Sequence, residues 1–535
     1  MEQRIDSPEL HSFAAAGAPA SPGASYYARL FLAVFLVLFL CGAGYDASEG
    51  VNHYVLAQNI VRTGSLGMDQ NPSTVYMTGP DGRRYSMHEI GNALTMLPWI
   101  MAGNAIARLA GDRLDLDRAD RLSAFLICLN GPLELAAMCT AFLWILVRRF
   151  AFSTATAMRA CVALAFGTTL FPYSKLAYDG LLLSVLLVGA LACAWAFDER
   201  PRMWLAALSG FFLAFGVITK IPGLFFIPAI VWCLAAAAWR ARSSWADVAK
   251  VLAAMGVPLL AAAVWQAYYN ALRTGDPWLP PVLTGRSASY HTFHGAHFFS
   301  ALAGVLVSPG KSIFFYSPPL LLGVAGWWLM YRGRRRDALL LAGFVLPFFF
   351  WQCSWKYWTG DWGWGPRYFL LIVAPLMIPA AFWVDRATRA KRLIWAIVLA
   401  WGMLIQAAAV WNNWEYRFAV LVDSGHTEAQ MIWSPRYNLW VDAILNVGRN
   451  LERMGGRRAW DVLPGSSPLH TRAVNTINVW WLNTPFSSRG QAVLLAGIAI
   501  LVLLDFFLWR RILENPSRKL QALNALPDER PLLAP

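Results

Sequence analysis

Groups that can exchange protons or bind anions are gathered in one long polar stretch, from Tyr45 to Pro98. Asp46 and Glu49 stand at its start, directly after an apolar segment. Its later part returns further groups toward the next apolar segment: Arg83, Arg84, His88 and Glu89. Carboxylates can take a proton from an attacking group, and cations can stabilise a phosphate as its charge develops. We therefore expect this stretch to form the catalytic face of an enzyme.

The elements that must position these groups are apolar and long enough to cross a lipid bilayer. The chain has 535 residues, of which 57% are hydrophobic, and its mean hydropathy is +0.44. A soluble domain is usually about 45–50% apolar. Since roughly 20 apolar residues cross a bilayer core, the sequence predicts an all-α polytopic membrane protein with about twelve spans. The predicted spans are residues 26–45, 120–147, 158–174, 177–197, 203–219, 221–239, 251–271, 313–331, 338–353, 368–384, 393–411 and 490–509.

The loops between these spans differ in charge and in length. Arg and Lys are concentrated in short loops on one side, near residues 148–149, 200–202, 240–250, 332–336, 386–392 and 510–511. The positive-inside rule makes that side cytoplasmic, with both termini on it. We therefore expect a multi-pass protein of the cell inner (plasma) membrane. Its long segments, 46–119, 272–312, 354–367 and 412–489, are then extracytoplasmic.

The predicted domain organisation follows from these spans. It comprises a disordered cytoplasmic tail 1–25, a transmembrane domain 26–411 that includes the loop 46–119, an extracytoplasmic segment 412–489, and a last span with its tail, 490–535. Residues 90–109 are apolar enough to form a further span. A span there would place the charges between Asp112 and Arg118 in the cytoplasm. It would also put every later loop on the side of the membrane opposite to the one that the positive-inside rule predicts. We therefore expect residues 90–109 to lie along the membrane surface.

Composition excludes several classes of function. The net charge is +14, but the basic residues are scattered among short loops, which suits membrane topology and anionic lipid headgroups and not nucleic acid. The seven cysteines lie within or at the ends of apolar segments, so they predict neither disulfides nor a zinc motif. Since the predicted cytoplasmic loops contain nothing that resembles a nucleotide site, we expect the activity on the extracytoplasmic face.

The sequence HTFHGAH, with His291, His294 and His297, suggests a metal site by its spacing. Gly295 and the neighbouring aromatic residues indicate irregular structure, and no acidic fourth ligand stands nearby. We therefore predict no metal site at these histidines. A divalent cation in the reaction remains an open alternative.

The order of the segments resembles a known class of membrane enzymes. A tail and a span precede an acidic residue at the outer end of that span, then a long first loop returning as YS…G…P, then many further spans. Three more stretches carry the resemblance: TLFPYSKLAYDG, SPGKSIFFYSPPLL and WGWGPRYFLLIVAP. Over about residues 26–385 the chain resembles the GT-C class of integral-membrane glycosyltransferases. Within that class it is near glycosyltransferase family 39, the protein O-mannosyltransferases and aminoarabinose lipid A transferases.

The chain also departs from that class. The Asp-Glu pair of mannosyltransferases is here split as Asp46 and Glu49, and the C-terminal third matches no pattern of the family.

The resemblance implies a polyprenyl-phosphate-linked sugar as donor and a hydroxyl of a glycan, lipid or protein as acceptor. It places the catalytic carboxylate at Asp46, which would take the acceptor proton and contribute about 10²–10⁴ in rate. Glu49 would share a helical face with Asp46, because it is three residues further on. Glu89 is expected either as a supporting carboxylate or metal ligand, or as a structural partner of Arg84. The alternative for Asp46 and Glu49 is a solvated charge at the end of a span.

The expected phosphate contacts are Arg367, in WGPRY, and Lys311, in SPGK. Both lie beside Gly and Pro at a predicted membrane interface. Arginine can bind phosphate through two nitrogens, whereas lysine acts as a point charge. The alternative is that each side chain extends to lipid headgroups. Weaker candidates of the same kind are Arg84, Lys175, Lys220 and Lys356.

Two other classes of function remain as alternatives. Twelve spans with both termini on one side also suit a multi-span transporter or a lipid-linked-sugar flippase. The missing internal repeat and the acids at the base of the outer loops favour an enzyme. A structural scaffold would not need Asp46, Glu49 and Arg367 together. Among the acids inside predicted spans, Glu134, Asp179 and Asp505, we interpret the last two as structural.

Overall fold

The computed structural model describes most of the chain. The described residues are 22–43, 50–68, 76–110, 116–175, 177–284, 295–360, 363–385, 387–414, 418, 421–422, 424–452, 479–483 and 488–524. In chain order the first elements are α1 (Ala24–Leu40), α2 (Gly50–Thr63), β1 (Tyr76–Thr78), β2 (Arg84–Ser86), α3 (Gly91–Ala110), α4 (Leu116–Ile127), α5 (Asn130–Arg148), α6 (Thr154–Gly167), α7 (Leu170–Tyr173), α8 (Asp179–Glu199), α9 (Met203–Thr219), η4 (Ile221–Phe226) and α10 (Ile227–Arg242). The later elements are α11 (Trp245–Thr274), η5 (Pro281–Leu283), α13 (Gly295–Val307), α14 (Ile313–Tyr316), α15 (Pro319–Gly333), α16 (Arg335–Cys353), η6 (Arg367–Phe369), α17 (Leu370–Asp385), α18 (Arg389–Trp411), α20 (Glu428–Trp433), α21 (Leu439–Glu452), α22 (Trp480–Asn483) and α23 (Ser488–Asn524).

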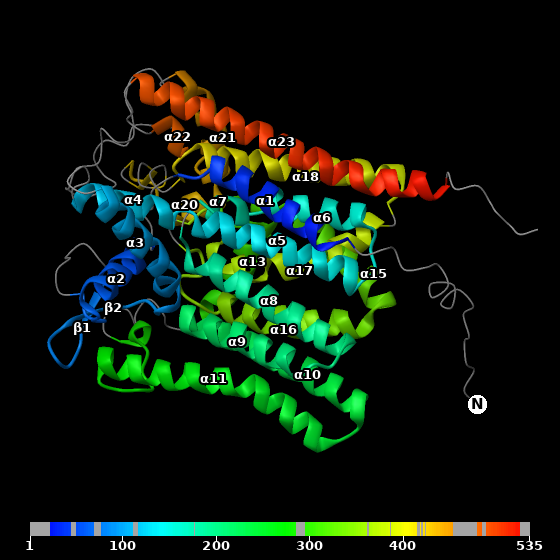
Figure 1. Ribbon diagram of the computed structural model, residues 1–535, viewed down its shortest axis with the longest axis horizontal. Coiled ribbons are helices and arrows are strands. Elements are labelled where there is room, and N and C mark those ends of the chain that lie inside the picture. The colour runs from blue at the N-terminus through cyan, green and yellow to red at the C-terminus, as the bar shows by residue number, and fades with distance from the viewer. Residues whose placement is uncertain are drawn as a thin grey trace, which may run out of the picture.

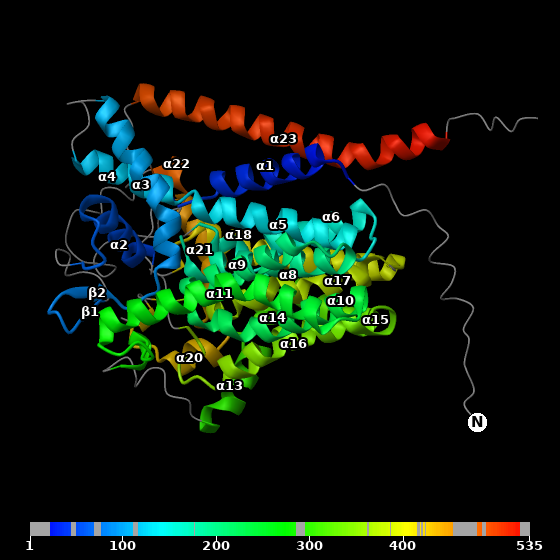
Figure 2. The same cartoon turned by 60° about the horizontal axis from the view of Figure 1, so that its bottom comes forward.

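The long helices form a bundle, and the first loop lies at one end of it. In Figure 1 most helices run alongside one another, from α23 at one edge to α11 at the other. The elements α2, α3, α4 and the hairpin β1–β2 gather at one end, and α20 and α22 lie at the same end (Figures 1 and 2). The described elements of the first loop, with α20 and α22 of the segment 412–489, therefore share one end of the molecule.

Within the described residues, eight helices are long and apolar enough to cross a membrane, by length and composition. They coincide with eight of the predicted spans, and the other four coincide with shorter helices, α1, α6, α9 and α15. Outward-facing apolar side chains agree with contact to lipid; Val257, Leu260 and Val264 on α11, for example, are 63–67% exposed. The chain is thus a helical, multi-pass membrane protein, and the count of twelve spans stays a prediction.

Residues 90–109, the candidate for a further span, form α3. In Figure 2 this helix runs across the ends of the bundle helices, not alongside them. Its outer residues Met101 and Leu109 are exposed. This orientation favours the surface position that the sequence predicts.

A short hairpin closes the outer part of the first loop. Tyr76 pairs with Ser86 and Thr78 with Arg84 in an antiparallel register. Asp81 fixes the turn, because its carboxylate accepts hydrogen bonds from the Tyr85 hydroxyl, at 2.7 Å, and from the backbone N–H of Arg83, at 3.0 Å. The hydrogen bond from Tyr85 holds the pKa of Asp81 below its usual value. Asp81 is therefore committed to the turn.

A network of buried charges lies among the loops that the sequence assigns to the cytoplasm. The guanidinium of Arg149 contacts Asp198 at 2.9 Å and Asp337 at 2.6 Å, and these side chains are at most 11% exposed. Further contacts come from Arg240 and Arg336 to Asp198, and from Trp195 to Asp337. Charges at the ends of α5, α8, α10 and α16 are thus gathered in one place. This agrees with the prediction that these helix ends lie on the same side of the membrane.

Glycines let α15 and α17 pack at backbone distance. A Cβ on Gly326 would lie 2.0 Å from the carbonyl oxygen of Pro379, and one on Gly323 would lie 2.2 Å from that of Leu376. Small residues at helix contacts are a common feature of membrane bundles. A Cβ on Gly343, in α16, would have no atom within 4 Å.

Replacing Gly326 by Ala is therefore expected to lower stability by about 1–3 kcal/mol, because the two helices must separate. The matched Gly343→Ala change is expected to raise it by about 0.5–1 kcal/mol, since alanine restricts the unfolded chain. The thermal midpoints of both variants in detergent test this pair. Equal shifts would show that α15 and α17 do not pack at backbone distance.

Candidate functional site

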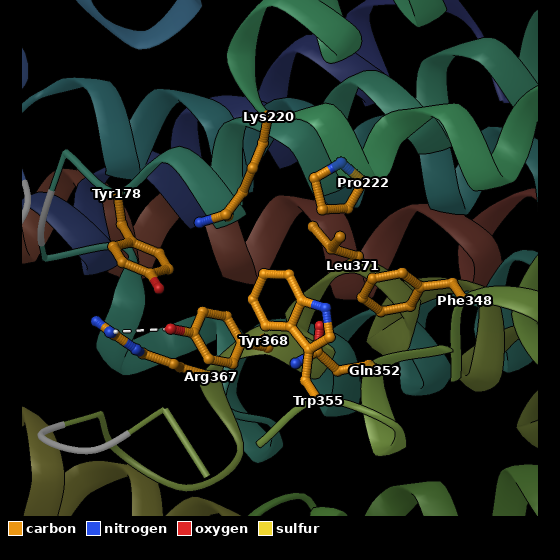
Figure 3. Close-up of a pocket in the computed structure, with 10 residues that line it drawn as sticks. Tyr178, Lys220, Pro222, Phe348, Gln352, Trp355, Arg367, Tyr368 and Leu371 are labelled. Carbon is orange, nitrogen blue, oxygen red and sulfur yellow. Dashed lines mark hydrogen bonds between the residues drawn. The ribbon is translucent and has the colours of Figure 1, made fainter. Parts of the chain in front are cut away.

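A small hollow opens at the bundle end that carries the first loop. Its lining combines two cations, four aromatic rings and several apolar groups, as Figure 3 shows. The lining residues are Tyr178, Gly180, Lys220, Pro222, Phe348, Gln352, Trp355, Arg367, Tyr368 and Leu371. They come from the start of α8, the junction of α9 with η4, the end of α16, and the segment that begins α17. The hollow can therefore hold an anionic group beside rings and hydrocarbon.

Arg367 lines the hollow, which is the position that a predicted phosphate contact requires. Its guanidinium lies 5.1 Å from the ring centre of Tyr368 and 6.0 Å from that of Tyr178, and Nη2 donates to the Tyr368 hydroxyl at 3.4 Å. Two glycines make room for it, because a Cβ on Gly360 or Gly363 would come within 2.6 Å of the Arg367 side chain. Gly360 also has a φ of 69°, which favours glycine. The WGWGP segment thus gives Arg367 its place.

Lys311 is not among the residues that line the hollow. Its side chain is buried, and Nζ donates to the carbonyl oxygens of Gly363, at 2.9 Å, and Gly365, at 3.2 Å. These carbonyls belong to the turn directly before Arg367. The structure therefore places Lys311 behind the turn that presents Arg367, and a direct contact of Lys311 with phosphate stays a prediction.

The second cation of the hollow is Lys220, which the sequence indicates only as a weaker candidate. Its Nζ lies 2.9 Å from both carboxylate oxygens of Asp179 and 5.6–5.7 Å from the ring centres of Tyr178 and Tyr368. Asp179 is buried and is the first residue of α8, where the helix dipole stabilises a negative charge. The sequence interpretation of Asp179 as structural therefore missed its position beside the hollow.

The first loop reaches this place through two histidines. His53 is buried on α2, and His88 follows β2; their ring centres are 5.2 Å apart. One ligand atom from each histidine and one carboxylate oxygen of Asp179 all lie within 4.8 Å of one another. The Asn52 side chain lies 3.5 Å from Nε2 of His88. The first loop thus meets the same carboxylate that contacts Lys220.

Glu89 forms a buried ion pair with Arg273 of α11, at 3.0 Å, and also accepts from Gln266 at 2.8 Å. Arg273 has a fully buried side chain and donates to the carbonyl oxygens of Ser86, at 3.4 Å, and His88, at 3.1 Å. The predicted structural partner of Glu89, Arg84, instead lies over the ring of Tyr76 in the hairpin, 4.7 Å from its centre. The pair with Arg273 therefore fixes the returning part of the loop.

The three stretches that carry the family resemblance meet beside the hollow. The Tyr173 hydroxyl, from TLFPYSKLAYDG, donates to the carbonyl of Trp364, from WGWGPRY, at 3.2 Å. Thr169, of the same first stretch, donates its N–H to the Ser317 hydroxyl of the SPGK stretch at 2.9 Å. Tyr316 lies edge-on to Trp364 with ring centres 5.1 Å apart. These stretches, at least 40 residues apart in sequence, thus build one end of the bundle around Arg367.

Several predicted residues lie outside the described part of the chain. Asp46 and Glu49 belong to residues 44–49, and His291 and His294 to residues 285–294. His297 is described and is exposed on α13. Asp46 and Glu49 therefore stay predictions, as does the statement that HTFHGAH holds no metal.

Comparisons with known proteins add structural likenesses. No family model matches the sequence, and no curated protein matches it. The fold is similar to ArnT from Cupriavidus metallidurans bound to undecaprenyl phosphate, with 14% identity, 79% of this chain and 74% of that chain covered, and a TM-score of 0.47. The apo state of ArnT gives 15% identity, coverages of 81% and 79%, and a TM-score of 0.45.

A third likeness is to the archaeal oligosaccharyltransferase AglB from Archaeoglobus fulgidus, in complex with an inhibitory peptide and a dolichol-phosphate. It has 13% identity, covers 87% of this chain and 62% of that chain, and has a TM-score of 0.41.

Proposed function

We propose that this protein is a GT-C-type membrane glycosyltransferase of the inner (plasma) membrane. It would move a sugar from a polyprenyl-phosphate-linked donor to an acceptor hydroxyl on the extracytoplasmic face. The proposal is supported chiefly by one observation: the motif stretches of the family resemblance converge on a hollow that holds Arg367 and Lys220 beside aromatic and apolar groups. The acceptor is a glycan, a lipid or a protein.

The hollow offers a complementary surface for each part of such a donor. Arg367 would bind the phosphate, because a guanidinium can donate two parallel hydrogen bonds to it. Phe348 and Leu371 provide apolar contacts for the first isoprene units, and Trp355 provides a ring for the sugar. Lys220 lies on the opposite side of the hollow from Arg367 in Figure 3 and adds positive charge where the phosphate leaves.

The reaction would use the carboxylate that the resemblance places at Asp46. The acceptor oxygen attacks the anomeric carbon of the sugar, and a new C–O bond forms while the bond from that carbon to the phosphate oxygen breaks. Asp46 takes the proton of the acceptor hydroxyl, and polyprenyl phosphate leaves with the bonding electron pair. Glu49 and Glu89 would support this step, Glu89 by holding the returning part of the first loop in place.

Transfer by the purified protein in detergent tests the function. A radiolabelled polyprenyl-phosphate sugar is incubated with the protein and with envelope extract as acceptor, and release of the label from the lipid is followed. An enzyme moves the label to the acceptor or to water without a sealed compartment. A transporter or flippase would instead leave the labelled lipid uncleaved in detergent. In proteoliposomes it would move the intact lipid across the membrane.

Replacing Arg367 by Ala is expected to weaken donor binding by about 10- to 100-fold, because a hydrogen bond to a charged group contributes roughly 1.5–3 kcal/mol. Acceptor binding should change little. The measurement is the separate dependence of transfer on donor and acceptor concentration. Arg108→Ala, on the exposed surface of α3, is the matched control and should behave as wild type. Equal weakening of donor and acceptor would assign Arg367 a structural role only.

A further inference from the structure

Two imidazoles and one carboxylate meet where the first loop joins the bundle, and we propose that His53, His88 and Asp179 bind one transition-metal ion of the zinc type. The inference concerns binding by the folded chain and does not depend on sugar transfer. It also differs from the HTFHGAH run, because the three residues come from α2, from the segment after β2 and from the start of α8.

The positions of these residues suit a metal site. A ligand atom from each lies within 4.8 Å of the other two, and His53 and Asp179 are buried. Zinc binds nitrogen and oxygen at about 2.0–2.2 Å, so two tetrahedral ligands stand roughly 3.3 Å apart. The three ligand atoms must therefore move closer together, and rotation of their side chains can achieve this. The backbone of His88 is held in place by Arg273, which donates to its carbonyl oxygen at 3.1 Å.

The ligand types select the class of ion. Imidazole nitrogen favours zinc, copper, iron and nickel, whereas magnesium and calcium prefer sites made of oxygen. Three protein ligands leave the fourth position of a tetrahedral ion for water or another small ligand. We therefore expect zinc to bind well above magnesium or calcium.

Lys220 is compatible with this ion, although it contacts both oxygens of Asp179 at 2.9 Å. A carboxylate offers about four lone-pair sites, so one oxygen can bind the ion while the other keeps the contact to Lys220. Partners of this kind orient a metal ligand and are common around protein metal sites. The ion would thus join the first loop to α8 beside the hollow that Lys220 and Arg367 line.

Metal content and affinity of the full-length protein in detergent test the proposal. The protein is stripped with a chelator and then loaded with Zn²⁺ alone, with Mg²⁺ as the comparison ion. We expect about one tightly bound zinc per chain by elemental analysis. His88→Ala and Asp179→Asn should each weaken zinc binding at least 10- to 100-fold in competition with a coloured chelator, since even the loss of an outer partner has an effect of about that size.

A triple variant of the alternative location, His291→Ala with His294→Ala and His297→Ala, is the matched control and should keep full affinity. Loss of zinc from this triple variant, with His88→Ala unaffected, would overturn the proposal. Absence of stoichiometric zinc from the native protein would overturn it as well.

If His88→Ala or Asp179→Asn fails to fold, Co²⁺ loaded into the native protein provides a second readout. X-ray absorption is expected to show nitrogen and oxygen neighbours at about 2.0–2.1 Å, with the outer-shell signal of two imidazoles. A spectrum with no imidazole signal would contradict the proposed ligands. None of these measurements uses sugar transfer, so a failed metal site and a failed transferase are distinguished.

Discussion

Replacing Asp46 by Asn is expected to lower the rate of sugar transfer by about 10²–10⁴-fold, the usual contribution of a general base. The amide keeps the size of the side chain but cannot take the acceptor proton. Donor binding should stay nearly unchanged, because the donor phosphate is assigned to Arg367. Single-turnover transfer with saturating labelled donor, together with donor binding measured separately, gives both quantities.

Asp81→Asn is the matched control for this experiment, since Asp81 is a carboxylate of the same loop that is committed to the hairpin turn through Tyr85 and Arg83. It should transfer sugar at the wild-type rate. Full transfer by Asp46→Asn would remove Asp46 as the base, and Glu49→Gln would then be the next variant to measure.

Replacing Arg273 by Met is expected to destabilise the protein by about 3–5 kcal/mol, because it leaves the Glu89 carboxylate buried without its cation. The side chains of the pair are 0% and 6% exposed. The double variant Arg273→Met with Glu89→Leu should recover most of this loss, since well-packed apolar groups often replace a buried pair at little cost. Thermal midpoints in detergent and proteolysis of the first loop measure the effect.

The exposed pair of Arg62 with Asp120, at 2.6 Å and with side chains 49% and 38% exposed, is the comparison. Arg62→Met should cost no more than about 1 kcal/mol, because solvent screens such a pair. A loss for Arg273→Met as small as that for Arg62→Met would show that the Glu89 pair does not hold the returning loop.

Local sequence signals predicted the helices and one cation of the hollow. Each predicted span coincides with a helix, because runs of apolar residues specify membrane helices with little help from distant contacts. Arg367 was identified through the glycines around it, and Gly360 and Gly363 do give its side chain room. The count of twelve spans stays a prediction, since α6 and α15, with 14 and 15 residues, are shorter than the apolar runs around them suggest.

Pairings between distant residues could not be predicted in the same way. Glu89 and its partner Arg273 are 184 residues apart, and the two expected partners Glu89 and Arg84 bind different groups. Asp179 and Lys220 are 41 residues apart, and each alone resembles an ordinary charge at a helix end. His53 carried no signal, because a single histidine on an amphipathic helix is common. The environment of Lys311 could not be predicted either, since its amine donates to carbonyl oxygens of a turn that forms only in the folded chain.

The central claim is that a carboxylate of the first loop and the Arg367 cation act on one lipid-linked sugar in one hollow. An experimental structure of the full chain in a lipid nanodisc, with polyprenyl phosphate added, tests it most directly. We expect the phosphate within hydrogen-bond distance of Arg367, with Asp46 facing the same hollow from the first loop. A phosphate bound elsewhere, or Asp46 on the other side of the membrane from Arg367, would contradict it.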